Sequence, residues 1–165
     1  MRSLIKGRAL TQDGWFYVGV DEGEAPAGTP RALPLKDYLA EREAGTDPAK
    51  IAVRLVPTDV DVAPLAAYAS SLPLVVVEFP STGDGRGFSQ ASLLRGRHGY
   101  RGELRASGKG VRADQMFFLA RCGFDSFELA PGENLQTALA QFERFTVAYQ
   151  DSPDGLVHPR HRYGS

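Results

Sequence analysis

The sequence predicts an α/β fold: a mainly parallel sheet of four to five strand–helix units in sequential, half-barrel-like order, preceded by an N-terminal β-hairpin. From residue 50 onward, apolar strand-like segments alternate with helix-like segments, with a period of roughly 25 residues. The segment Leu74–Phe79 is apolar along almost its whole length, as parallel strands covered on both faces are. Because crossovers between such units are right-handed, the repeat predicts a parallel sheet.

The composition fits a single domain. A chain of 165 residues, 42% hydrophobic and 24% charged, can bury a substantial core. We expect residues 1–150 to form this domain, with residues 1–34 as hairpin and loop and residues 50–150 as the strand–helix repeats. Residues 151–165 are expected to be a flexible basic tail.

Charge and hydropathy exclude several classes of protein. The 19 basic residues are balanced by 20 acidic ones, which gives no electrostatic indication of nucleic-acid binding. No apolar run is long enough to span a membrane, and the N-terminus lacks the layout of a signal peptide. We therefore expect a cytoplasmic protein that binds neither nucleic acid nor membrane.

The N-terminal third is expected to support the repeats and to carry little chemistry. Two apolar segments, Ser3–Leu10 and Trp15–Val20, are predicted to pair as a hairpin because Asp13-Gly14 between them is a turn signal. Residues 21–34 are rich in glycine, proline and acids and predict a surface loop. Leu35–Arg42 predicts a short helix.

The repeats are predicted in order along the chain. The strands are Ile51–Val56, Leu74–Phe79, Gly102–Ser107, Phe124–Leu129 and a last one at Thr146–Gln150. The helices between them begin at polar caps or end at glycines. They run from Asp61 to about Leu72, from Ser89 to His98, from about Ala113 to Gly123, and onward from Asn134.

One charged side chain in each strand bears on strand order. These residues alternate in sign along the chain: Arg54, Glu78, Arg105 and Glu128. If consecutive strands are neighbours, the four side chains share one face and can pair across the sheet. Buried charges are compensated only by adjacent partners, so this charge ladder favours sequential order over a doubly wound order.

Sequential order gives an arc that resembles half of a (βα)₈ barrel. A complete barrel needs roughly 200 residues or more, so we do not expect closure. The concave face of the sheet is then expected to be covered by the N-terminal hairpin or by a second copy of the chain in a homodimer.

A glycine-rich loop after the second strand of the repeats is the strongest candidate site. Its alternate glycines let backbone N–H groups approach a ligand, the following helix N-terminus favours an anion, and an arginine adds a bidentate donor. The loop consists of Gly83, Asp84, Gly85, Arg86 and Gly87. The alternative is a tight turn whose glycines supply positive φ and whose Asp84 caps the helix.

Further cations surround this loop. Basic residues outnumber acidic ones between Ser81 and Arg112, which suits a small anion or an acidic partner. We include Arg105 and Lys109 with the loop as ligand-binding residues. A solvated helix face that carries arginines is the alternative.

Cys122 is the only cysteine, which excludes an intrachain disulfide, a Cys₄ iron–sulfur site and a CxxC pair. We expect it to pack as a small hydrophobic residue. The histidine and acidic residues show no metal-ligand spacing, so no metal site is predicted. The sequence identifies no cofactor and no catalytic residue.

Five motifs together resemble an uncharacterised bacterial family. They are Gly85-Arg86-Gly87-Phe88-Ser89, Leu93-Leu94-Arg95, Gly99-Tyr100-x-Gly102-Glu103-Leu104-Arg105-Ala106, Asp114-Gln115 and Arg121-Cys122-Gly123-Phe124-Asp125. The family is labelled as oxidoreductases of sulfite reduction and is often encoded beside sulfite or nitrite reductase. The resemblance runs from about Leu33 to Gln150. In the family an Asp often follows the glycine after the third strand, and this chain has Lys109 there, so an acidic role does not carry over.

The resemblance implies sulfur assimilation as the process and leaves three functions open. The first is an accessory protein of assimilatory sulfite reduction that binds a small oxyanion or docks on the reductase. The second is an oxidoreductase acting with a bound nucleotide or flavin, against which the single cysteine and the missing dinucleotide fingerprint count. The third is a non-catalytic module whose concave face is a subunit interface.

Overall fold

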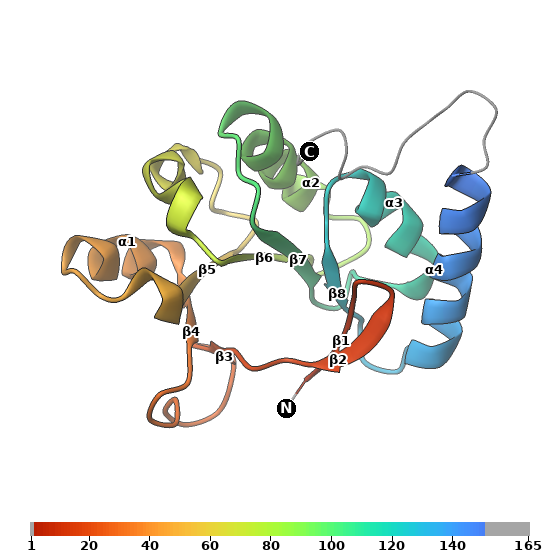
Figure 1. Cartoon of the computed structure of the whole chain (residues 1–165), viewed down its shortest axis with the longest axis horizontal. Coiled ribbons are helices and arrows are strands. Elements are labelled where there is room, and N and C mark those ends of the chain that lie inside the picture. Colours follow the sequence, from red (N-terminus) through yellow and green to blue (C-terminus); the bar gives the residue numbers. More distant parts are fainter. Residues whose placement is uncertain (1, 151–165) are drawn as a thin grey trace.

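The computed structural model describes residues 2–150, with the backbone alone for residues 142 and 144–150. One eight-stranded sheet curls into an open arc, and the helices lie on its convex side (Figure 1). The strand order is β2-β1-β8-β7-β6-β5-β4-β3. The strands are β1 (Ser3–Lys6), β2 (Ala9–Gln12), β3 (Phe16–Tyr17), β4 (Arg31–Pro34), β5 (Ile51–Leu55), β6 (Leu74–Glu78), β7 (Glu103–Ser107) and β8 (Ser126–Glu128).

Several kinds of helix connect these strands. The α-helices are α1 (Leu35–Glu43), α2 (Arg86–Ser92), α3 (Met116–Arg121) and α4 (Leu135–Gln150). The 3₁₀ helices are η1 (Pro48–Lys50), η2 (Ala63–Ser71) and η4 (Ala113–Gln115), and α2 continues into the π-helical turn η3 (Leu93–Arg97). Within the described range, no helix has both the length and the apolar character needed to cross a membrane.

The α/β class and the half-barrel arrangement are confirmed, and β5 to β8 are neighbours in sequential order. The prediction of a mainly parallel sheet of four to five units is wrong, because the N-terminal residues add four strands of their own. Strands β3 to β8 are parallel, whereas β1 runs antiparallel to both β2 and β8. The sheet is therefore mixed.

The hairpin turn lies elsewhere than predicted. Gly7 and Arg8, with φ of 59° and 66°, form the turn between β1 and β2. Positive φ at both central residues matches the right-handed twist of paired strands. Asp13-Gly14 instead connects β2 to β3, which lie at opposite edges of the sheet.

This short connection shows how far the sheet curls. Gln12 and Phe16 are four residues apart, so the two sheet edges are separated by at most roughly 14 Å. The connection runs across the open side of the arc (Figure 1). The N-terminal segment thus covers the concave face, as one of the two predicted alternatives requires.

Two predicted segments take another structure. Arg31–Pro34, expected in a surface loop, forms β4 because Ala32 and Leu33 are buried against its neighbours. Thr146–Gln150, expected as a last strand, belongs to α4. The free edge of β8 is already paired with β1, through Ile5 opposite Phe127, which leaves no place there for a further strand.

The sheet is apolar on both faces. Val75 and Val77 of β6 face the main core beneath the helices, whereas Leu74 and Val76 face a smaller concave cluster with Tyr17. Strand β6 is thus covered on both sides, as its uninterrupted apolar sequence predicts. The concave face also carries the charged residues described next.

Candidate functional site

The strand register stacks the concave side chains of β5 to β8 in three levels. The level at the amino ends of the strands contains Leu74 opposite Glu103. The middle level, here called the inner level, contains Arg54, Val76, Arg105 and Ser126 in one row. The outer level, nearer the carboxyl ends, contains Glu78, Ser107 and Glu128. The four charges of the predicted ladder therefore share the concave face but are divided between two levels.

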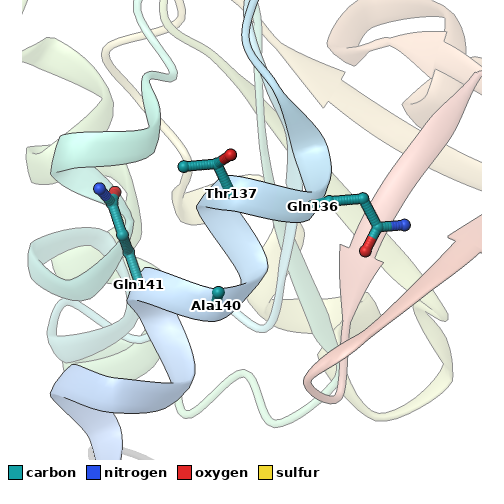
Figure 2. A pocket seen from close by; sticks show the side chains of 4 residues that line it. All are labelled: Gln136, Thr137, Ala140 and Gln141. Atoms are coloured by element: carbon teal, nitrogen blue, oxygen red, sulfur yellow. The ribbon is translucent and has the colours of Figure 1, made fainter.

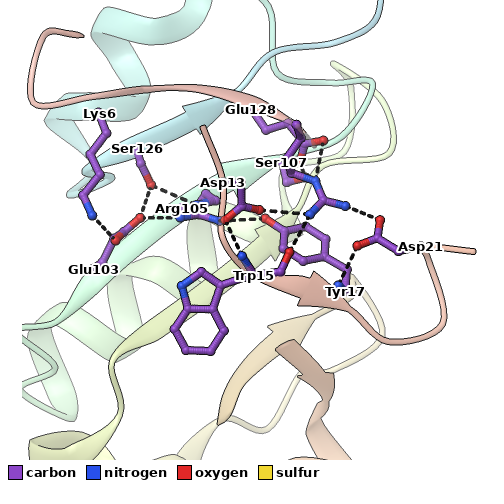
Figure 3. Close-up of polar contacts among 11 residues, drawn as sticks. Lys6, Asp13, Trp15, Tyr17, Asp21, Glu103, Arg105, Ser107, Ser126 and Glu128 are labelled. Carbon is purple, nitrogen blue, oxygen red and sulfur yellow. Dashed lines mark hydrogen bonds and ion pairs between the residues drawn. The ribbon is translucent and has the colours of Figure 1, made fainter. Parts of the chain in front are cut away.

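Arg105 lies at the centre of a buried polar network (Figure 3). Its Nη1 donates to Asp13 Oδ1 and to the Tyr17 hydroxyl, both at 3.0 Å. Its Nη2 donates to Glu103 Oε2 at 2.8 Å, and its Nε donates to Ser126 Oγ at 3.2 Å. All three nitrogens are thus engaged by protein groups, and the side chain is 3% exposed.

These contacts keep Arg105 charged. Burial alone would lower its pKa, but the attraction of Tyr17, Glu103 and Asp13 outweighs burial and raises the pKa. Glu103 shows the same balance with opposite sign. Burial alone would raise the pKa of Glu103, yet Arg105, Lys6 and Ser126 together lower it. The charged members of the network neutralise one another and join β1 to β7, and the Ser126 hydroxyl adds β8.

The N-terminal segment contributes ion pairs and hydrogen bonds that no pattern in the sequence predicted. Arg2 donates to Asp13 Oδ2 at 2.9 Å, its guanidinium carbon lies 3.6 Å from the centre of the Tyr17 ring, and its Nε is 3.3 Å from Glu128 Oε1. It also pairs with Asp21. Asp13 and Arg105 are 92 positions apart. No local pattern reports such a pair.

Only one of the ion pairs expected between neighbouring residues of the charge ladder is present. Arg54 Nη1 lies 3.5 Å from Glu78 Oε2. Arg105, however, takes Asp13 and Glu103 as its partners, and Glu128 takes Arg2. The register explains this result, because Arg105 lies opposite Val76 and Ser126, one level below the two glutamates.

A cavity of about 270 Å³, here called the mouth cavity, opens at the carboxyl ends of the parallel strands. Its apolar lining is Tyr17, Val20, Val76, Leu129 and Pro131. Its polar lining is Arg54, Glu78, Ser107, Lys109 and Glu128. Functional groups of parallel sheets and barrels collect at this end of the strands. The mouth cavity therefore contains three ladder residues and the predicted ligand residue Lys109.

The two cations of the mouth cavity are incompletely paired. Lys109 is exposed and has no hydrogen bond or ion pair to any residue in the described range. Arg54 Nη2 donates to Val18 O at 3.2 Å, but its Nε is buried and lacks a hydrogen-bond partner among the same residues. Glu128, by contrast, accepts the Ser107 hydroxyl and pairs with Arg2.

Close backbone packing holds the loop that carries Lys109. Gly110 N donates to Phe79 O at 2.7 Å. Gly108 has φ of +116°, and a Cβ there would lie 2.6 Å from Phe79 O. A Cβ on Gly110 would lie 2.5 Å from Ser81 O. Only glycine fits at these two positions, so the loops after β6 and β7 form one rim.

The two charged residues of the predicted glycine-rich loop, Asp84 and Arg86, pair with each other. Arg86 donates through Nη2 and Nε to Asp84 at 2.7 and 3.0 Å, and Asp84 Oδ1 also accepts from the Arg86 N–H. Hydrogen bonding by the Arg86 side chain lowers the pKa of Asp84. Gly83, Gly85 and Gly87 all have negative φ. At Gly87 a Cβ would meet the Phe79 ring at 2.6 Å, so this glycine permits close helix–strand packing.

A family model for bacterial proteins of unknown function, designated DUF934, matches residues 52–158. The chain belongs to this family. The suspected membership of an uncharacterised bacterial family is thus confirmed, and the match begins in β5 and includes the rim of the mouth cavity. Neither a curated protein nor a solved structure matches the chain.

Other features of this DUF934 protein offer less chemistry. A depression of about 460 Å³ is lined by Gln136, Thr137, Ala140 and Gln141 of α4, none of which is ionisable (Figure 2). Cys122 is half-buried, and burial raises the pKa of its thiol. In the part of the chain that the structure describes, no three His, Cys, Asp or Glu side chains are grouped as metal ligands. His158, His161 and the predicted basic tail lie outside that part.

Proposed function

We propose that this DUF934 protein is a cytoplasmic accessory protein of assimilatory sulfite reduction that binds a small oxyanion in the mouth cavity. One observation carries the binding site: Lys109 and Arg54 line the same cavity, and neither cation has its hydrogen-bonding capacity filled by the protein. An entering oxyanion gains a charge-assisted hydrogen bond from exposed Lys109 and is attracted by the charge of Arg54, without breaking a strong internal ion pair.

The proposed anion position differs from the glycine-rich loop that the sequence predicted. Asp84 engages two of the three side-chain nitrogens of Arg86, Nε and Nη2, and Arg105 is engaged on all three of its nitrogens. An anion at either residue has to compete with a carboxylate that is already bound. Of the cations predicted to bind a ligand, Lys109 has none of these competitors.

Sulfite as the ligand is supported by the motif resemblance to proteins labelled for sulfite reduction. A small oxyanion also suits a cavity of about 270 Å³ whose donors are side-chain tips rather than an extended groove. Docking on sulfite or nitrite reductase belongs to the same proposal. The concave face as a subunit interface is less favoured, because Asp13 and Tyr17 of the chain itself already pack against it.

Calorimetric titration with sulfite, sulfate and phosphate tests the binding site. Lys109→Gln is expected to weaken oxyanion binding by about tenfold or more, since it removes a charged donor. The matched control is Lys50→Gln, which removes an exposed lysine at the amino end of β5, and we expect it to bind like the wild type. If Arg86→Ala abolishes binding while Lys109→Gln does not, the anion site lies in the glycine-rich loop.

The process is tested by deletion of the gene in a host grown on sulfite as its sole sulfur source. Slow growth that is restored by sulfide or cysteine supports a role in sulfite reduction. Complementation with wild type and failure with Lys109→Gln would link the growth defect to the mouth cavity. Normal growth of the deletion strain would exclude the role in that host.

A further inference from the structure

The mouth cavity contains one carboxylate with unused acceptor capacity. Glu78 is 37% exposed at its side chain, and its single ion pair, to Arg54, is long at 3.5 Å. No residue in the described range donates a hydrogen bond to its carboxylate within standard geometry. Glu128 lines the same cavity but is occupied by Ser107 and Arg2.

This arrangement places a pure acceptor beside the two cations that favour an anion. A carboxylate accepts hydrogen bonds and donates none. An anion bound next to Glu78 therefore needs a proton of its own to donate. A fully deprotonated dianion would set its lone pairs and its charge against those of Glu78, which costs free energy. Ser107 does not relieve this conflict, because its hydroxyl already donates to Glu128.

Small oxyanions differ in this respect. Hydrogenphosphate and hydrogensulfite carry an O–H group, and both species are populated in neutral solution, whereas sulfate carries none. Hydrogenphosphate and sulfate share a tetrahedral arrangement of four oxygens, and hydrogensulfite is a smaller anion with three. The presence of a donor is thus the property on which a lone carboxylate in this cavity can discriminate.

We propose that Glu78 determines the specificity of the mouth cavity by accepting a hydrogen bond from an oxyanion that retains a proton, and that it excludes sulfate. The inference rests on the proposed function, namely that Lys109 and Arg54 hold an anion in this cavity. Lys109 and Arg54 supply attraction to any oxyanion, and Glu78 selects among them. The ligand class is a small anion with its own hydrogen-bond donor.

Calorimetric titration of four proteins with three separate anions tests this specificity. The anions are sulfite, phosphate and sulfate, and the proteins are the wild type, Glu78→Gln, Lys109→Gln and Glu133→Gln. Glu133 lies on a neighbouring loop, where it pairs with Arg112 at 3.4 Å, so Glu133→Gln controls for the loss of one negative charge near the rim.

We expect the wild type and Glu133→Gln to prefer sulfite and phosphate over sulfate by about tenfold or more. Glu78→Gln supplies an amide N–H, so its preference is expected to fall by about tenfold, mainly through tighter sulfate binding. Sulfite binding to the wild type should also weaken as the pH rises through neutrality and hydrogensulfite loses its only proton, whereas phosphate keeps an O–H group over this range. Tighter binding of sulfite than phosphate would identify hydrogensulfite, and the reverse would identify a phosphate-type ligand.

The outcomes separate the two proposals. Two outcomes overturn the specificity role of Glu78 and leave the proposed binding site standing. In the first, binding depends on Lys109 but the wild type shows no preference against sulfate. In the second, the preference is unchanged in Glu78→Gln. If no anion binds to the wild type, both proposals are overturned. Circular dichroism checks that Glu78→Gln is folded. We expect it to fold, because the Glu78 side chain is partly exposed.

Discussion

Arg54 and Arg105 occupy the same level of the same sheet face and are separated only by Val76. Their hydrogen-bond and ion-pair partners nevertheless differ sharply. Arg105 is 3% exposed and donates to Asp13, Glu103, Ser126 and Tyr17 at 2.8 to 3.2 Å. Arg54 has one ion pair at 3.5 Å and a buried Nε without a hydrogen-bond partner among the described residues.

The difference teaches how one face can serve both structure and binding. The N-terminal segment brings Asp13 and Tyr17 over β7, so the charge of Arg105 is neutralised by groups of the protein itself (Figure 3). Over β5 the same segment offers only the Val18 carbonyl. Arg54, which the N-terminal segment leaves with an unpartnered donor, is the arginine that lines the mouth cavity.

The sharpest test of this comparison is to remove each arginine in turn. Arg105→Met leaves Asp13 and Glu103 buried without their main cation and is expected to lower the free energy of unfolding by about 3 kcal/mol or more. Arg54→Met removes a weak pair and an unsatisfied donor, so a loss below about 1 kcal/mol is expected. Urea denaturation measures both values. Equal losses for the two variants would show that the arginines are equivalent.

A second test concerns the rim beside Arg54. Gly108→Ala places a Cβ at 2.6 Å from Phe79 O in a residue with φ of +116°, and we expect a loss of about 1–3 kcal/mol. Gly83→Ala is the matched control, because a Cβ there meets nothing within 4 Å and its φ is negative. It should change stability by less than about 1 kcal/mol. A neutral Gly108→Ala in thermal denaturation would mean that the rim is not tightly packed.

The smallest expected effect is the pH dependence of the Arg105 network. The pKa of Glu103 is held below its ordinary value of 4.5, so the folded protein binds fewer protons there than the unfolded chain. The stabilising contribution of Glu103 is complete above that value and is lost as the pH falls through the folded pKa. Urea denaturation at a series of acidic pH values measures it.

Glu103→Gln should flatten this acid-side slope relative to the wild type. The control, Glu24→Gln, changes an exposed residue of the loop before β4 and should retain the wild-type slope. Identical slopes for wild type and Glu103→Gln would show that the network does not shift the proton affinity of Glu103.

Local patterns predicted the repeats well. The apolar segments around Val53, Val76 and Leu104 and the caps at Asn134 and Gly123 indicated strands and helices close to those observed, because periodicity and capping act over a few residues. The alternating charges also indicated the order of β5 to β8. The hairpin turn was misplaced because Asp13-Gly14 is a strong turn signal, whereas Gly7-Arg8 is a weak one.

The candidate site was anticipated only in fragments. Lys109, Arg54 and Glu78 were each singled out, but for a glycine-rich loop or a ladder rather than for one cavity. Asp13, Tyr17 and Arg2 were not expected to contribute at all. Their contacts with Arg105 and Glu128 join positions that are far apart in the chain and depend on the closure of the arc.

The sequence by itself determined the alternation of strands and helices, the sequential order of the repeats and the presence of a ladder charge on each of four strands. It determined these because each follows from side-chain periodicity within a single segment or between consecutive ones. Only the tertiary structure decided which charges neutralise one another and which remain open to a ligand. That outcome depends on the register between strands and on the path of residues 13–15 across the arc, and both are set by long-range packing.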